Sequence, residues 1–192
     1  MCIRDRFNPL HLGSDSTLKN GNLDYTSSNT SWGTNYAFST IGVTSGKWYA
    51  EATITDFTSA YHYVGIMADP TTWAVATGSL GYQINGGGYT QGYIYTSAVA
   101  NQSGLYVYGL NDVIGVALDM DNRTVTYYAN GTQIGTPEPL CTNGKVFHFA
   151  TQGYNQCGQS WNFGQRAWAQ TPPSGYKACL LYTSDAADDP TC

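Results

Sequence analysis

The sequence predicts an all-β protein, an antiparallel two-sheet β-sandwich. No stretch shows the 3.6-residue spacing of apolar residues that marks an amphipathic helix, whereas short apolar or alternating runs recur between turn signals. The composition agrees: 22 glycines and 16 tyrosines accompany a charged fraction of only 11%. Aromatic residues favour strands and glycine favours turns, so many short strands at this spacing indicate a sandwich.

The expected strands lie between clusters of Gly, Asn, Asp, Ser and Pro. Asn130-Gly131 is the sharpest turn signal and predicts a two-residue hairpin, because both residues tolerate positive φ and strand-like runs flank them. The predicted strands are residues 37–43, 47–55, 61–68, 80–84, 92–95, 105–108, 113–119, 124–129, 132–134, 146–151 and 159–163.

Two of these strands also predict which side chains are buried. Val113-Ile-Gly-Val-Ala-Leu118 is apolar on both alternating sets, which predicts a central strand covered on both faces. Gly115 is expected to permit the close approach of a neighbour. Thr124-Val-Thr-Tyr-Tyr128 alternates instead, so Val125 and Tyr127 are expected to face the core.

The two ends of the chain match translated sequencing adapter. Met1-Cys-Ile-Arg-Asp5 is encoded by a widely used transposase adapter from its first ATG, and Cys179-Leu-Leu-Tyr-Thr-Ser-Asp-Ala-Ala-Asp188 by its extended reverse complement. We therefore expect residues 1–6 and 179–192 to be adapter, outside the predicted fold. The natural protein is expected to continue beyond Ala178.

Charge and hydropathy argue against two classes of partner. Without the end segments, six Lys and Arg stand against nine Asp and Glu, so the formal net charge is −3 rather than the −5 of the whole chain. A mildly acidic domain disfavours a phosphate backbone, and no apolar run approaches a membrane span. Nucleic acid and membranes are not expected partners. Outside the end segments, Cys141 and Cys157 favour two free thiols, with one disulfide as the alternative.

Three motifs occur in the order in which SPRY domains carry them. Gly46-Lys-Trp-Tyr-Ala-Glu51 resembles the tryptophan–glutamate strand of that family. Residues 112–135, with the Asn130-Gly131 hairpin, resemble its central strand and acidic turn. Trp161-Asn-Phe-Gly-Gln165 and Pro172-Pro-Ser-Gly-Tyr-Lys-Ala178 resemble its C-terminal signature. The resemblance covers residues 46–178, with 7–45 expected as a lead-in that packs on the sandwich.

The resemblance implies a concanavalin A-like jelly roll, with two curved antiparallel sheets packed face to face. It implies a non-catalytic module that binds a protein or peptide through loops at one edge of the sandwich. The lead-in is similar to that of SPRY proteins from bacteriophages and metagenomes. A structural or tail protein of a phage, located in the virion, is therefore expected.

Three loops carry the candidate ligand-binding residues. By resemblance, the binding edge includes the segments 69–79 and 154–156, and the loop 27–36 adds further aromatic side chains. An exposed Trp or Tyr supplies much contact area at little entropic cost. The candidates are Trp73, Thr77, Tyr154, Asn155, Gln156 and Tyr36. A carbohydrate-binding, lectin-like sandwich is the alternative function, because Tyr and Trp also stack on sugars, and a purely structural decoration domain is a third.

No catalytic group, metal or cofactor is expected. Glu51 and Asp56 stand an odd number of residues apart, which turns them to opposite faces of a strand. Glu51 is instead predicted to be a buried carboxylate held by hydrogen bonds. No Gly-x-Ser-x-Gly motif occurs. Asp119-Met-Asp-Asn122 offers oxygen ligands but lacks the rest of a calcium loop, so it predicts a tight acidic turn.

Overall fold

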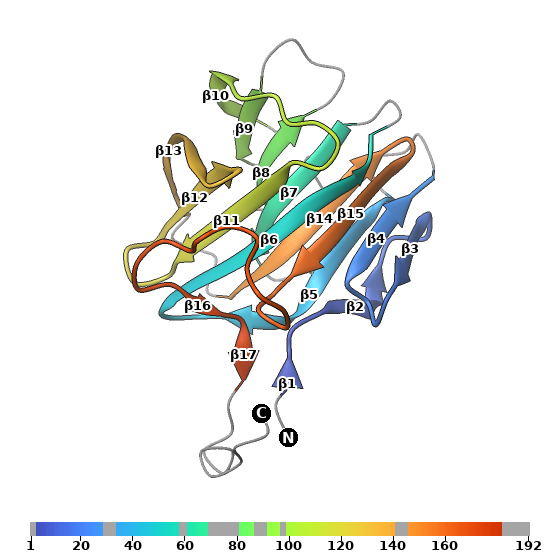
Figure 1. The fold of residues 1–192 in the computed structure, drawn as a ribbon, viewed down its shortest axis with the longest axis horizontal. Helices are drawn as coiled ribbons and strands as arrows, with labels where there is room; N and C mark the ends of the chain where they lie inside the picture. Colours follow the sequence, from blue (N-terminus) through green and yellow to red (C-terminus); the bar gives the residue numbers. More distant parts are fainter. Residues whose placement is uncertain are drawn as a thin grey trace.

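The computed structural model describes residues 3–28, 34–57, 61–68, 81–86, 92–96, 99–140 and 146–181. Two antiparallel sheets lie face to face, which confirms the predicted β-sandwich (Figure 1). In spatial order, the seven-stranded sheet consists of β10 (Val99–Leu105), β9 (Gly92–Thr96), β8 (Gly81–Gly86), β7 (Tyr61–Ala68), β14 (Phe147–Tyr154), β5 (Tyr36–Val43) and β2 (Phe7–Leu12).

The eight-stranded sheet forms the second layer. It consists of β13 (Thr132–Pro139), β12 (Thr124–Ala129), β11 (Val113–Asp119), β6 (Lys47–Asp56), β15 (Cys157–Asn162), β4 (Asp24–Ser27) and β3 (Ser16–Lys19), with β16 (Lys177–Ala178) parallel to β6. A separate pair joins β1 (Ile3–Arg4) to β17 (Leu180–Leu181). Within the described ranges, no helix is long and apolar enough to cross a membrane.

The predicted strand at residues 105–108 is wrong. The structure instead pairs β10 with β9 through two shifts of register and ends β10 at Leu105. The alternation of Leu105-Tyr-Val-Tyr108 resembles a strand, but Tyr108 is fully buried in the core while Tyr106 stays exposed. The lead-in supplies β2 and β5 to the seven-stranded sheet and β3 and β4 to the eight-stranded sheet.

The core lies between the sheets, and its central strand is β11. Ile114, Val116 and Leu118 join the core, and Ala117 on the opposite face is also fully buried, so β11 is covered on both faces as predicted. The hairpin from β12 to β13 turns at Asn130 and Gly131 with φ of 49° and 81°, which confirms the two-residue turn. The predicted burial of Val125 and Tyr127 is confirmed at 0% exposure.

The chain between β15 and β16 covers the outer face of the eight-stranded sheet. In Figure 1 its orange-to-red trace passes over β11 and β6. Trp168 packs edge-on against Tyr49, with ring centroids 5.2 Å apart. A Cβ at Gly115 would lie 2.4 Å from the Tyr49 hydroxyl, so the glycine makes room for this ring, as predicted. Glu51 is buried beneath the same segment.

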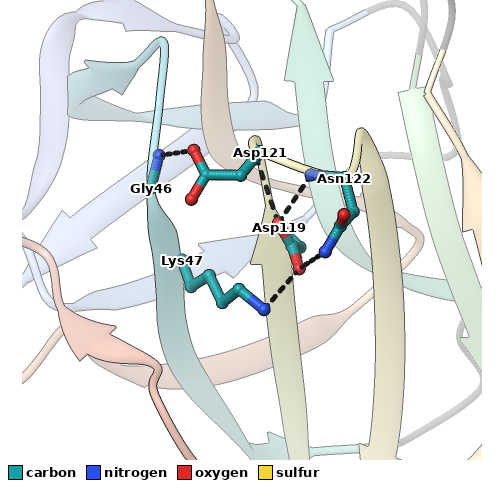
Figure 2. Close-up of polar contacts among 5 residues, drawn as sticks. All are labelled: Gly46, Lys47, Asp119, Asp121 and Asn122. Atoms are coloured by element: carbon teal, nitrogen blue, oxygen red, sulfur yellow. Dashed lines mark hydrogen bonds and ion pairs between the residues drawn. The ribbon is translucent and has the colours of Figure 1, made fainter.

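Figure 2 shows the acidic turn between β11 and β12. Asp119 Oδ1 accepts the backbone N–H groups of Asp121 and Asn122 at 3.1 and 2.9 Å, and its Oδ2 lies 3.0 Å from Lys47 Nζ. Asp121 accepts the N–H of Gly46 at 2.7 Å. Burial raises the pKa of Asp119, but the hydrogen bonds from Asn122 and the charge of Lys47 outweigh it and leave that pKa lowered. The carboxylates of Asp119 and Asp121 therefore stabilise the turn between β11 and β12, which confirms the predicted acidic turn.

Two residues of the end segments are packed against the domain. Asp5 is 1% exposed and accepts hydrogen bonds from Thr40 Oγ1 and the N–H of Ile41 at 2.7 and 3.0 Å. Cys179 is fully buried and donates its N–H to the carbonyl of Phe163 at 3.0 Å. The adapter origin of residues 1–6 and 179–192 stays a prediction, because these contacts do not test where the segments came from.

Candidate functional site

Tyr36 and Tyr154 lie on the same face of the seven-stranded sheet. Gln152 of β14 pairs with Tyr36 of β5, and residues two apart on a strand point the same way, so Tyr154 shares that face. It is the outer face, because Phe38 and its partner Ala150 form a cluster separate from the main core. Sequence reasoning placed Tyr36 in a loop; the structure makes it the first residue of β5.

The Tyr36 side chain is partly withdrawn from solvent. Its ring lies 5.4 Å from that of Phe38 at an interplanar angle of 47°. Tyr36 and Tyr154 are both half-buried. Each therefore presents part of a ring to the outside while the remainder packs on the sheet.

Asn155 and Gln156 form the tip of the hairpin from β14 to β15. Asn155 adopts a φ of 69°, which Asn tolerates better than most residues, and its carbonyl accepts the Ser27 hydroxyl at 2.7 Å. Gln156 is exposed. The N–H of Gly153 donates to the Asn35 carbonyl at 3.1 Å. The structure thus brings four of the six sequence-predicted residues to one end of the sandwich.

The other two candidates, Trp73 and Thr77, lie outside the described residues, as do Trp32 and Cys141. Cys157, which follows the hairpin tip, is a buried free thiol. Burial is the main cause that raises its pKa to about 11, so it is a poor nucleophile at neutral pH. Within the described part of the chain, no cluster of three or more His, Cys, Asp and Glu could hold a metal ion.

A groove that the sequence did not indicate lies at the opposite edge of the sandwich. It has a volume of about 390 Å³ and runs between the end of β10 and the hairpin of β12 and β13. Leu105, Ile134 and Ala129 supply apolar walls, and Tyr106 and Gln133 line it as well. Tyr106 is 48% exposed.

A hydrogen-bond network centred on Asp112 holds the rim of this groove. Its carboxylate accepts the Tyr106 hydroxyl at 3.1 Å, the N–H of Gly109 at 2.7 Å and the amide of Asn130 at 2.8 Å. Asn130 in turn accepts the N–H of Val113 at 3.0 Å. The hydrogen bond to Asp112 is the main cause that raises the pKa of Tyr106, so the phenol stays protonated.

The sequence does not indicate this groove, because its two walls come from separate segments of the chain that meet only in the folded protein. Gln102 of β10 accepts the N–H of Thr136 at 2.8 Å and donates to its carbonyl at 2.9 Å, which ties the edges of the two sheets together. The Asn130-Gly131 signal predicts the hairpin but not its neighbour. The nearest signal was the aromatic pair Tyr106 and Tyr108, which alternation assigned to a strand.

Residues 19–166 match the family described as the SPRY domain. The chain belongs to the SPRY family. The match includes β4 and β5, which lie upstream of the motif that begins at Gly46. No curated protein matches the sequence.

Solved SPRY domains have the same fold. The SPRY domain of human HERC1 superposes with a TM-score of 0.66 at 17% identity, covering 84% of this chain and 99% of that one. The PSpry domain of TRIM65 gives a TM-score of 0.61 at 12% identity, covering 83% of this chain and 92% of that one. At such identities the likeness concerns the fold alone.

Proposed function

We propose that this SPRY domain is a non-catalytic recognition module that binds a protein or peptide through one end of the sandwich. The binding surface would combine Tyr36 and Tyr154–Gln156 with Trp73 and Thr77. Membership of the SPRY family is the observation that carries the proposal, since SPRY domains are protein-interaction modules. The half-buried rings of Tyr36 and Tyr154 support it, because rigid aromatic side chains make good anchors.

The partner is proposed to be a protein rather than nucleic acid or a membrane, and no cofactor takes part. The net charge of −5 for the whole chain supports this, because binding to phosphate needs clustered positive charge. Glu51, the carboxylate of the tryptophan–glutamate motif, accepts backbone N–H groups from Ala169 and Gln170 and so has a structural role.

Substitution of the aromatic candidates tests the site. Trp73→Ala and Tyr154→Ala are each expected to weaken binding of a partner captured from host envelope by about tenfold, roughly 1.4 kcal/mol, as anchors do. The affinity would be measured by calorimetry, with circular dichroism to verify folding. Leu10→Ala is the matched control, because Leu10 is 87% exposed on β2. Unchanged affinity in both variants would place the site elsewhere, and selective binding to a glycan array would favour the lectin alternative.

We further propose that the domain belongs to a bacteriophage structural or tail protein and is located in the virion. The similarity of the lead-in, residues 7–45, to phage and metagenomic SPRY proteins motivates this. Sequencing the natural gene past the expected adapter boundaries is expected to reveal neighbouring tail or capsid genes. Neighbours that encode host metabolism would contradict the viral origin while leaving the recognition function intact.

A further inference from the structure

The groove beside the hairpin of β12 and β13 has the size and walls of a binding site for one large side chain. Its volume of about 390 Å³ lies within the range of ligand pockets. Leu105 and Ile134 make its walls apolar, and the Tyr106 ring stands at the rim with 48% of its surface exposed. An aliphatic or aromatic side chain is the natural occupant, because it would remove this apolar surface from water.

An exposed aromatic side chain, Tyr106, stands at this groove. Among the described residues, the large exposed hydrophobic side chains are Leu10, Tyr106 and Leu110. Tyr106 lines the groove, and Leu110 is 56% exposed in the neighbouring turn of residues 109–112. A large exposed ring beside an apolar groove is typical of an interaction surface.

The charge around the groove selects a cationic partner. The segments that form it, residues 99–119 and 124–139, contain no Lys or Arg. Asp112 is stabilised only by neutral donors, namely a phenol, an amide and a backbone N–H. The ion pair between Lys47 and Asp119 lies in the turn at the other end of β11, away from Asp112. The negative charge of Asp112 is therefore not balanced locally, and a Lys or Arg of a partner would complement it.

The two sides of the groove are fixed before any partner binds. Gln102 bonds both the N–H and the carbonyl of Thr136, and Asn130 links Asp112 to the start of β11. Binding would then cost little ordering of the protein. An extended peptide fits better than a globular surface, because a single side chain can enter the groove while its neighbours reach Asp112.

We propose that this groove is a second peptide-binding site, which takes an extended segment with one aliphatic or aromatic side chain next to Lys or Arg. The proposal rests on the proposed recognition function but concerns a different surface. In the seven-stranded sheet, β9, β8 and β7 separate β10 from the strands that carry Tyr36 and Tyr154. At the ordinary spacing of strands, β10 lies roughly 19 Å from β14 and roughly 24 Å from β5.

The test uses the full chain and three sets of fluorescein-labelled nonapeptides, each with a central Leu, Phe or Tyr. The flanking residues are Lys and Arg in the first set, Ser in the second and Glu in the third. Fluorescence polarisation is expected to show binding of the basic set, at least tenfold tighter than the acidic set, and weakened by salt. Amide-shift mapping is expected to place the bound peptide at Gln133 and Ile134.

Substitutions at the rim of the groove test whether the peptides bind there. Tyr106→Ala is expected to weaken the basic peptides about tenfold, whereas Tyr106→Phe, which keeps the ring, should change the affinity less than threefold. Asp112→Asn is expected to remove the preference for basic over neutral flanks. Leu10→Ala again serves as the exposed apolar control on β2 and should have no effect. Circular dichroism would verify that each variant is folded.

The other outcomes separate the two proposals. Equal affinity for basic and acidic sets, or no binding by any set, overturns the groove as a site for basic peptides. Binding that maps to Tyr36 and Tyr154 and is insensitive to Tyr106→Ala also overturns it, while it supports the proposed function. If neutral oligosaccharides bind and neither the peptides nor a captured protein does, both proposals fail together.

Discussion

Trp161→Ala is expected to lower the free energy of unfolding by about 3–5 kcal/mol, the usual range for removing a fully buried Trp. Trp161 has 0% exposure on β15 and stacks on Phe163 with ring centroids 5.4 Å apart. It also meets Phe7 of β2 edge-on at 5.4 Å and lies 6.5 Å from Phe149 of β14. The ring therefore joins the two sheets, and its loss leaves a cavity between them.

The same substitution leaves a buried acceptor with fewer donors. Trp161 Nε1 donates to Gln159 Oε1 at 2.9 Å, and Gln159 is fully buried. Gln159 Oε1 still accepts the Thr151 hydroxyl at 2.6 Å, so the lost hydrogen bond adds only about 0.5–1.5 kcal/mol of destabilisation. Because a domain of this size has a total stability of about 5–15 kcal/mol, we expect Trp161→Ala to be partly unfolded at 37 °C.

Urea unfolding of three variants would measure these effects. Trp161→Phe keeps an aromatic ring but loses the N–H, so its loss of stability is expected to be about half that of the alanine variant. Trp168→Ala is the matched control, because Trp168 is only half-buried on the outer face of the eight-stranded sheet. A loss below about 1 kcal/mol for Trp161→Ala would contradict the role of this ring as the link between the sheets.

The elements that sequence reasoning predicts correctly are those with a local cause. The Asn130-Gly131 hairpin depends on two residues that accept positive φ, and the sequence places both in the turn. The burial of β11 on both faces follows from the unbroken apolar run Val113–Leu118, and all seven positions of the strand are buried. Trp161 and Phe163 lie on one face, as alternation predicts, and stack there.

The errors and omissions have causes that are distant in sequence. β10 ends at Leu105, and Tyr108 beyond it is buried in the core, which alternation alone cannot show. Tyr36 joins β5 because Gln152, more than a hundred residues away, pairs with it. The groove likewise needs Leu105 beside Ile134, a contact between the edges of two sheets. Local patterns therefore identify the family and most strands, whereas the proposed binding surfaces are formed by long-range pairing.

Glu51→Ala is expected to detach the C-terminal segment from the outer face of the eight-stranded sheet. Glu51 is 2% exposed, and its two oxygens accept the backbone N–H groups of Ala169 at 2.9 Å and Gln170 at 2.8 Å. The Tyr49 hydroxyl donates to it at 3.4 Å. Hydrogen bonds to a charged group contribute about 1.5–3 kcal/mol each, so we expect a loss of about 3 kcal/mol, since the two bonds are not independent.

Hydrogen exchange distinguishes local detachment from general weakening of the domain. The amides of Ala169 and Gln170 are expected to exchange at least tenfold faster in Glu51→Ala, while amides of β11 change only as far as global stability falls. Glu51→Gln keeps one carbonyl oxygen as an acceptor and should give an intermediate result. Equal acceleration in β11 and at Ala169 would show that Glu51 stabilises the sheet itself. Local detachment would instead show that this carboxylate fastens the closing segment of the SPRY fold, which explains why a glutamate occupies a buried position in a domain with so few charges.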